Sequence, residues 1–461
     1  MNVDERRLSV PPGTTTRSST GRSIPLVVYI LAVGTFTMLT TEFIVAGILT
    51  QLAADLDISV SQAGLLITVF AAGMVIGAPL MALLTLRLPR RLTLLLALAV
   101  FAAGHVVVAL GSNLQLLLVA RFITALATGA FWAIAGVVAA KSAVPGMASR
   151  ALGIINAGGM LATVLGVPLG AFASQHFGWR GSFWGLAALA VISAVLIARF
   201  VPQDKAEHAS VSVRNEIAGL ASGRLWLTLA ACATTTGGVL AAYSYISPLL
   251  VDGTGFSESA IPLVLIGFGV GSLVGSLVGG RLGDARPHLL TIIAPTASTL
   301  ILLAICLLSD QKLPMIALIA LLGFFGLGAN PILASLAITY GKKAPTLASS
   351  LTVAGFNAGT VVASWAGGKA LESSLGTTGP MLLGACVAVL TLIPVIILAI
   401  LARRAASPAK TEKGKKSRRV GIIYRSDAVV ARGNKSYFSR YASNLTRFAS
   451  GNARKSGFAS N

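Results

Sequence analysis

The stretch GMVIGAPLMALLTLRLPRR, residues 73–91, decides how the chain is organised, because a related stretch, GSLVGSLVGGRLGDARPH, occupies residues 271–288. The two copies are 198 positions apart and share two glycines and one proline: Gly73 with Gly271, Gly77 with Gly275, and Pro89 with Pro287. A second pair, IINAGG from Ile154 and GFNAGT from Gly355, recurs at a spacing of 201. The sequence therefore predicts two related halves.

Composition places both halves in a membrane. The 461 residues have a mean hydropathy of +0.82 and only 11% are charged, against about 25% in soluble globular proteins. A helical span needs about 20 apolar residues to cross a hydrocarbon core of about 30 Å. Polar residues divide the chain into twelve such runs, residues 24–49, 63–84, 92–109, 114–140, 151–172, 183–198, 225–251, 261–282, 289–308, 314–340, 347–370 and 380–402.

We therefore predict an all-α polytopic membrane protein with twelve transmembrane helices in two six-helix bundles. The predicted organisation is a disordered N-terminus (1–23), a first bundle (24–198), a linker (199–224), a second bundle (225–402) and a basic disordered tail (403–461). Two parallel repeats of this kind are typical of secondary transporters, in which the substrate binds between the repeats near the middle of the membrane.

The distribution of basic residues predicts the orientation. The net charge is +21, but 15 of the 36 Lys and Arg lie in residues 403–461, so the charge does not indicate a nucleic-acid surface. In the remainder, thirteen basic residues lie in connectors that follow even-numbered spans, and only three, Arg180, Lys312 and Lys369, lie in the other connectors. Because short cytoplasmic loops are enriched in Lys and Arg, we expect a multi-pass protein of the plasma or inner membrane with both termini cytoplasmic.

Several classes of chemistry are disfavoured. All three cysteines, Cys232, Cys306 and Cys386, fall inside predicted spans, so neither a disulfide framework nor a metal site is indicated. The segment GFGVGSLVG resembles a dinucleotide fingerprint, but its glycines continue a four-residue spacing (267, 271, 275, 279) that favours close packing of a membrane helix. No GxxxxGK[ST] phosphate loop is present. We expect no cofactor, and energy from an ion gradient or from the substrate's own gradient.

Three sets of motifs carry a family resemblance. The loop ALLTLRLPRR is a degenerate copy of G-x-x-x-D-R-x-G-R-R, with Leu86 in place of the acid and Pro89 in place of the second glycine, whereas the repeat copy GRLGDARPH retains the glycine and the acid. RFITALATG matches a fourth-helix arginine pattern at Arg121, and LGVPLG, residues 165–170, matches a fifth-helix antiporter motif. In this order and at these helices, the motifs resemble the major facilitator superfamily, specifically its twelve-helix drug:proton antiporter group, over about residues 24–402.

Within that group, TTEF, APLMALLTLRLPRR and YISPLLVDGTGF are most similar to chloramphenicol exporters and arabinose-type sugar efflux carriers. The resemblance implies a gating role for two loops, represented by Arg87, Arg90, Arg91, Gly280, Asp284 and Arg286. It implies a conformational role for the antiporter motif, in which Gly166, Pro168 and Gly170 should bend the fifth helix and let a neighbour approach closely.

Glu42, in TTEFIVAG (residues 40–47), is the one acid deep within any predicted span. Insertion scales assign a charge at the bilayer centre a cost of about 2.5 to 3.5 kcal/mol, so such an acid normally faces a cavity, a partner or a transport pathway. Arg121 lies at a matching depth in the fourth span, and buried opposite charges tend to pair. We predict that Glu42 and Arg121 couple transport to protons; the alternative is a purely structural pair.

Other polar and aromatic residues in the spans are less specific. The tentative residues of a substrate cavity are Phe131, Trp132, Asn156, Tyr243, Tyr245, Asn330 and Asn357. For each of them, helix packing or local hydrogen bonding is the alternative. His105, in the third span, is expected to be a core histidine whose hydrogen bonds are satisfied.

These observations predict a monomeric, proton-coupled secondary transporter in the lipid bilayer, not an enzyme. It should export small, neutral or weakly polar drugs, amphenicol-like compounds first, by alternating access of the two halves. The alternative is efflux of sugars or nucleosides. A membrane enzyme would need a second acid, His or Cys converging on Glu42, and the pattern of the spans indicates none.

Overall fold

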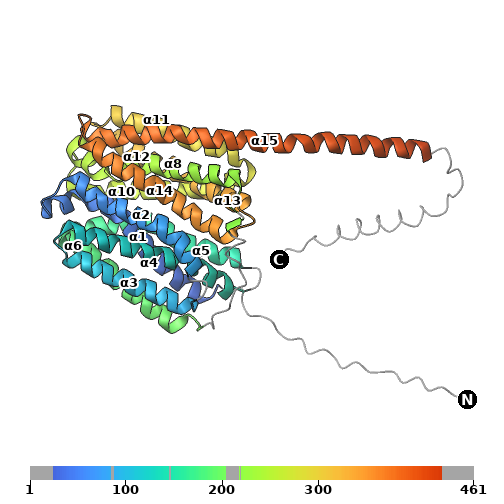
Figure 1. Cartoon of the computed structure of the whole chain (residues 1–461). Helices are drawn as coiled ribbons and strands as arrows, with labels where there is room; N and C mark the ends of the chain where they lie inside the picture. Colours follow the sequence, from blue (N-terminus) through green and yellow to red (C-terminus); the bar gives the residue numbers. More distant parts are fainter. Residues whose placement is uncertain (1–23, 85–87, 145–146, 204–216, 219, 428–461) are drawn as a thin grey trace, which may run out of the picture. The chain divides into compact units, whose positions relative to one another are not determined.

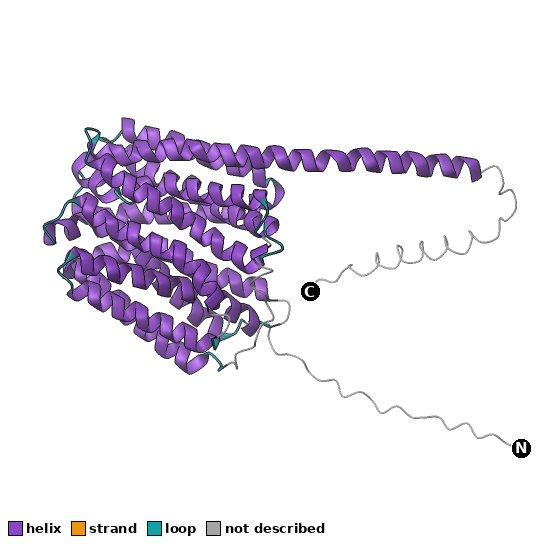
Figure 2. Ribbon diagram, viewed as in Figure 1, coloured by secondary structure: helices purple, strands orange, loops and turns teal. Residues whose placement is uncertain are grey.

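The computed structural model describes residues 24–84, 88–144, 147–203, 217–218 and 220–427, and in these residues the regular structure is entirely helical (Figures 1 and 2). The first half contains α1 (Leu26–Asp55), α2 (Val60–Leu84), α3 (Arg90–Leu110), α4 (Leu114–Ser142), α5 (Ala148–Leu161), η2 (Ala162–Gly166) and α6 (Val167–Phe200). The second half contains α8 (Gly223–Tyr243), α9 (Ile246–Pro248), η3 (Leu249–Gly253), η4 (Glu258–Ala260), α10 (Ile261–Ala285), α11 (Pro287–Leu307), α12 (Lys312–Gly328), α13 (Asn330–Tyr340), α14 (Pro345–Leu371), η5 (Gly376–Thr378) and α15 (Gly379–Asp427).

Eleven helical segments of the described residues are long and apolar enough to cross a membrane, whereas the sequence predicts twelve. The difference lies in residues 150–200, where α5, η2 and α6 follow one another as one candidate span of 51 residues. At about 1.5 Å per residue this segment is roughly 75 Å long, more than twice a hydrocarbon core of about 30 Å. Gly178, within it, has a non-helical backbone with φ 70° and ψ 163°, which glycine adopts with little strain.

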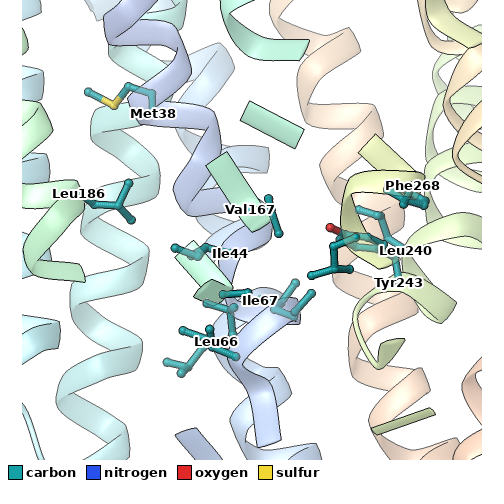
Figure 3. Close-up of a cluster of buried hydrophobic side chains, with 14 of the residues drawn as sticks. Met38, Ile44, Leu66, Ile67, Val167, Leu186, Leu240, Tyr243 and Phe268 are labelled. Atoms are coloured by element: carbon teal, nitrogen blue, oxygen red, sulfur yellow. The ribbon is translucent and has the colours of Figure 1, made fainter. Parts of the chain in front are cut away.

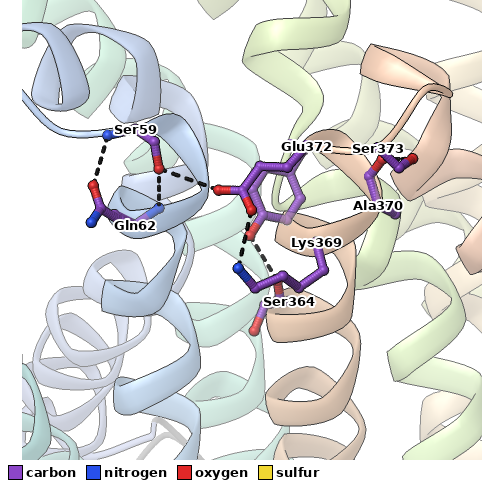
Figure 4. Close-up of polar contacts among 8 residues, drawn as sticks. Ser59, Gln62, Ser364, Lys369, Ala370, Glu372 and Ser373 are labelled. Carbon is purple, nitrogen blue, oxygen red and sulfur yellow. Dashed lines mark hydrogen bonds and ion pairs between the residues drawn. The ribbon is translucent and has the colours of Figure 1, made fainter.

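Polar residues and prolines set where the helices begin. The Asn113 side chain accepts a hydrogen bond from the Gln115 amide (2.8 Å) at the start of α4. At the start of α2, Ser59 and Gln62 form a reciprocal capping box, in which each side chain accepts from the other residue's amide (2.9 and 3.1 Å; Figure 4). Proline occupies the first turn of α10, α11, α13 and α14, where its missing N–H costs no helical hydrogen bond.

The two halves pack internally and then against each other. Helix α3 packs on α4 and α6 in the first half, and α8 packs on α14 in the second. The halves meet where α2 contacts α14 and where η2 and α6 contact α10. One buried apolar cluster spans this junction (Figure 3); its labelled members are Met38, Ile44, Leu66, Ile67, Val167 and Leu186 from the first half and Leu240, Tyr243 and Phe268 from the second.

The glycine face of α10 packs directly on the backbone of α12. A methyl group at Gly271 or Gly275 would lie 2.0 Å from the carbonyl oxygen of Ala320 or Phe324, respectively. A methyl group at Gly267 would have Ala320 Cβ as its nearest neighbour at 3.8 Å, which is an ordinary contact distance. The close helix approach predicted from the four-residue spacing is therefore present.

Neutral hydroxyl pairs join the two halves within the membrane. Thr68 Oγ1 of α2 lies 2.8 Å from Ser364 Oγ of α14, and Thr163 Oγ1 of η2 lies 3.4 Å from Ser272 Oγ of α10. These pairs lie in the helices that form the junction, so the halves are linked there by polar contacts that carry no charge.

Charged residues join the halves at the helix ends near residues 51–59 and 372. Glu372, after α14, accepts a hydrogen bond from Ser59 Oγ (3.4 Å) and pairs with Lys369 (3.0 Å; Figure 4). Hydrogen bonds from Lys369 and Ser61 hold the pKa of Glu372 below its usual value. Glu258 accepts from the Gln51 side chain (3.2 Å). We call the Ser59–Glu372 contact the outer latch, since it lies on the side predicted to face outward.

The last helix extends beyond its predicted end. The sequence predicts a disordered tail from residue 403, but α15 continues to Asp427. An existing helix lengthens without a new nucleation step, and Ala, Lys and Arg have high helix propensity. Residues 400–461 form a unit separate from residues 1–399. The predicted N-terminus (1–23), residues 204–216 of the predicted linker, and residues 428–461 lie outside the described residues.

Candidate functional site

A pocket at the junction of the two halves contains Glu42. It is lined by Glu42, Phe43 and Ala46 of α1, Ile67, Phe70 and Ala71 of α2, Leu240 and Tyr243 of α8, Ser244, and Thr360 of α14. Glu42 is the one carboxylate of this lining. The space holds about one water molecule, so a drug-sized ligand, which typically needs about 300 Å³ or more, requires the halves to move apart.

Arg121 of α4 is fully buried beside this pocket. Its Nη1 donates to Thr41 Oγ1 (2.7 Å), its Nε donates to the Leu66 carbonyl (3.3 Å), and its Cζ lies 4.2 Å from the centre of the Phe70 ring. Nη2 is buried and has no hydrogen-bond partner among the described residues. Three contacts therefore hold the guanidinium in place and leave one terminal nitrogen unpaired.

His105 of α3 extends this contact into a chain of hydrogen bonds. Its Nε2 lies 2.7 Å from Thr41 Oγ1, and its Nδ1 lies 2.7 Å from the carbonyl oxygen of Phe101. The imidazole stacks on the Phe101 ring at 3.9 Å and is almost completely buried. His105 is thus the satisfied core histidine that the sequence predicts, but it is also joined through Thr41 to the fully buried Arg121.

The structure brings Glu42 and Arg121 into one region without pairing them directly. Phe70 contacts the guanidinium and also lines the pocket of Glu42, and Thr41, which accepts from Arg121, is the residue before Glu42. Among the described residues, however, no ion pair joins the two, and Glu42 makes no hydrogen bond. Their role in proton coupling stays a prediction.

The antiporter-motif residues lie against the part of α1 that carries Glu42. A methyl group at Gly166 would be 2.1 Å from Thr40 Oγ1, and one at Gly170 would be 2.2 Å from Ile44 Cδ1. Pro168 follows η2, a π-helical turn, in the first turn of α6. The motif therefore lets the backbone come close to α1 on both sides of Glu42, and its conformational role stays a prediction.

The tentative cavity residues separate into distinct environments. Tyr243 lines the pocket, stacks on Phe268 (4.2 Å), and has a buried hydroxyl without a partner among the described residues. Tyr245 lies outside the lining and donates to the Ser364 carbonyl (2.7 Å), so it ties α9 to α14. The others also lie outside this pocket. Phe131 is buried against Gly34, Trp132 is near Gly159, and Asn156 is exposed on α5. Asn330 and Asn357 are on α13 and α14, and their side-chain carbonyl oxygens are buried with no partner in the part of the chain that the structure describes.

The predicted gating loops are only partly described. Arg87 lies outside the described residues, and the side chain of Asp284 is not described. Arg91 donates to the Ala198 carbonyl of α6, so it holds the start of α3 to another helix of its own half. Arg90 starts α3, Gly280 has open space around it on α10, and Arg286 is exposed between α10 and α11. A gating role for these residues stays a prediction.

Sequence reasoning missed Thr41 and the second-half residues Leu240, Ser244 and Thr360. Leu240 is equivalent to Glu42 by the 198-residue repeat, and this was a signal that it faces the same junction. For Thr41 the signal was its position beside an intramembrane acid. His105 carried a signal of its own, as an ionisable residue inside a span.

Two related helical halves with a pocket at their junction are the arrangement of many secondary transporters of the membrane. A sequence model of the Major Facilitator Superfamily matches residues 31–310 and 229–445. The chain belongs to that superfamily, and it is a multi-pass membrane transporter rather than an enzyme.

Individual relatives agree with this assignment. The chain is 32% identical over 361 residues to a chloramphenicol resistance protein of Streptomyces lividans, a match that covers 78% of this chain and 92% of that protein. It is 29% identical over 352 residues to the putative transporter AraJ of Escherichia coli, covering 76% and 89%. The crystal structure of a bacterial homologue of the human lysosomal transporter Spinster matches with a TM-score of 0.61 at 16% identity, covering 81% of this chain and 95% of that one. The predicted resemblance to chloramphenicol exporters and arabinose-type carriers is confirmed.

Proposed function

We propose that this transporter exports small, neutral or weakly polar drugs in exchange for protons, and that Glu42 carries the proton. The observation that carries the proposal is the position of Glu42, the single carboxylate lining a pocket between the two halves. An acid in that place can face either side of the membrane as the halves rock, and a nearby buried arginine can respond to its charge.

The lining of the pocket favours a largely apolar substrate. Seven of its ten residues are apolar or aromatic, and the polar groups other than Glu42 are the hydroxyl-bearing Ser244, Thr360 and, among the aromatics, Tyr243. Such a surface suits an aromatic molecule with a few hydroxyl or amide groups, of which chloramphenicol is an example. The similarity to a chloramphenicol resistance protein supports the same class. Sugars or nucleosides are the second candidate class of substrate. The similarity to the putative transporter AraJ supports this alternative.

The remaining features of the proposed transporter concern its arrangement in the membrane. The 51-residue segment would cross twice and turn near Gly178, which gives twelve spans and places both termini on the cytoplasmic side of the inner membrane. The outer latch would then close the outward side, and the pocket would open towards the cytoplasm to load substrate. The proposed working unit is a monomer in the bilayer.

The test is a susceptibility panel in a bacterial host that lacks its own drug pumps. Expression of the chain should raise the inhibitory concentration of chloramphenicol and related amphenicols, and dissipating the proton gradient should remove the effect. Expression that leaves amphenicol susceptibility unchanged but relieves the toxicity of sugars or nucleosides would reverse the order of the two substrate classes. Amphenicol resistance that persists without a proton gradient would overturn proton coupling.

A further inference from the structure

We propose that Thr41 and His105 are positioning residues that hold Arg121 away from Glu42. The inference rests on the proposed function, because it explains how an acid close to a buried arginine remains available to protons. It is drawn from the hydrogen-bond chain described above, which runs from Arg121 through Thr41 and His105 to the Phe101 carbonyl.

The direction of each hydrogen bond in this chain is fixed by its ends. Arginine only donates, so Thr41 Oγ1 accepts from Nη1. A carbonyl only accepts, so the proton on His105 lies on Nδ1, which faces the Phe101 oxygen. In the neutral imidazole Nε2 is then the acceptor, and the Thr41 hydroxyl donates to it. The histidine thus turns the hydroxyl so that its lone pairs face the guanidinium.

Thr41 differs in this respect from its neighbours on α1. The hydroxyls of Thr35, Thr37 and Thr40 each donate to the backbone carbonyl four residues earlier, at 3.0, 3.0 and 2.7 Å. This is the usual arrangement for threonine in a helix. The hydroxyl of Thr41 instead joins α3 and α4, so the contact with Arg121 depends on His105.

The position of Arg121 matters because Glu42 is its natural alternative partner. Nη2 is buried and has no hydrogen-bond partner among the residues that the structure describes, and Glu42 lines a pocket that shares Phe70 with the guanidinium. Tyr243 is the other titratable side chain of that lining. His105 contacts Thr41, Phe101 and Phe183, and Arg121 is the charged residue that shares the Thr41 hydroxyl with it. While Thr41 holds Nη1, the carboxylate remains unpaired; without that contact, the guanidinium would turn to Glu42 and neutralise it.

The experiment compares Thr41→Val with Thr41→Ser and Thr35→Val. Valine has the shape of threonine without the hydroxyl, and serine keeps the hydroxyl. Thr35 is an equally buried threonine of α1 whose hydroxyl donates to the Leu31 carbonyl of its own helix. The readout is the pH dependence of chloramphenicol export in vesicles. An arginine paired with the carboxylate favours its charged form, so Thr41→Val should move the midpoint of the pH profile to lower pH by about 1 unit. Thr41→Ser and Thr35→Val should keep the parent's midpoint.

His105→Leu tests the second link. Without Nε2 as acceptor, the Thr41 side chain should rotate to donate to the Thr37 carbonyl, as Thr35, Thr37 and Thr40 do to theirs. This rotation moves Oγ1 away from Arg121 Nη1, so the midpoint should move in the same direction as in Thr41→Val. A loss of protein from the membrane with an unchanged midpoint in both variants would overturn the positioning role and leave a structural one.

A second measurement separates this inference from the proposed function. Infrared titration of purified protein, using the carboxyl band that Glu42→Gln removes, follows protonation without transport. A lower midpoint in Thr41→Val supports the positioning role even if chloramphenicol is not exported. A midpoint equal to that of the parent overturns it even if export is proton-driven.

Discussion

Replacing Glu42 by Gln should abolish uphill export while leaving substrate exchange intact. Glutamine keeps the size of the side chain and much of its hydrogen bonding, but it cannot bind and release a proton in the physiological range. In the proposed mechanism the single carboxylate of the pocket lining carries one proton in each cycle. A gradient of one pH unit supplies about 1.36 kcal/mol, which limits accumulation of an uncharged substrate to about tenfold. A membrane potential of 100 mV would add about 2.3 kcal/mol, which multiplies that limit by about 50 and raises it to about 500-fold.

The assay uses inside-out vesicles with an acidic lumen, a clamped membrane potential and labelled chloramphenicol. The parent should approach tenfold accumulation for one pH unit, and Glu42→Gln should stop at equal concentrations while still exchanging labelled for unlabelled substrate. Asp310→Asn makes the equivalent change in an exposed connector and should behave like the parent. If Glu42→Gln accumulates substrate tenfold, Glu42 is a structural residue and the reasoning from its position fails.

Three further predictions concern packing, the outer latch and the tail. Gly275→Ala should lower the melting temperature in detergent by several degrees, since overpacking costs about 1–3 kcal/mol, whereas Gly267→Ala, at an ordinary contact distance, should not. When Glu372 is held in the outer latch, its pKa lies below the usual value of about 4.5. The latch should therefore be intact at neutral pH, and it should be lost as the pH falls through this lowered pKa and the carboxylate is protonated. Distances between spin labels at the outer ends should then widen, and they should already be wide at pH 7 in Glu372→Ala, which removes the acceptor of the Ser59 hydroxyl. Deleting residues 410–461, which belong to a separate unit, should leave chloramphenicol export unchanged at equal membrane abundance, and a loss of export would show a function for the tail.

Hydropathy and the internal repeat predicted the parts of the fold that depend on local composition. The apolar runs became helices because a spanning segment must satisfy its own backbone hydrogen bonds. The glycine spacing of α10 predicted a close neighbour, and α12 occupies that position. The sequence predicts a loop between the fifth and sixth spans, but the structure has a continuous helical segment there. The helix is interrupted only by the non-helical backbone of Gly178.

The sequence predicted a residue of the candidate site only where placing its side chain in the membrane costs so much free energy that it needs a functional explanation. Glu42 met that condition, and it lines the junction pocket. Thr41 did not, because a threonine in a helix usually bonds to its own backbone, and nothing in TTEF distinguishes it from Thr40. Its partners depend on which faces of α1, α3 and α4 meet, and that depends on packing across the whole bundle. For the same reason Tyr243 and Tyr245, two residues apart, have different surroundings.

The hydroxyl pairs between the halves make their separation reversible at small energetic cost. Ser364 and Thr68 each have a carbonyl of their own helix within reach, at 2.7 and 3.4 Å, and so do Thr163 and Ser272, both at 2.8 Å. When the halves part, each hydroxyl can keep or regain a bond to its own backbone, so no polar group is stranded in an apolar environment. A charged pair in the same places would have to be desolvated again in every cycle. If the halves separate and rejoin in each cycle, as proposed, the hydroxyl pairs at the junction can break and re-form without a large desolvation cost.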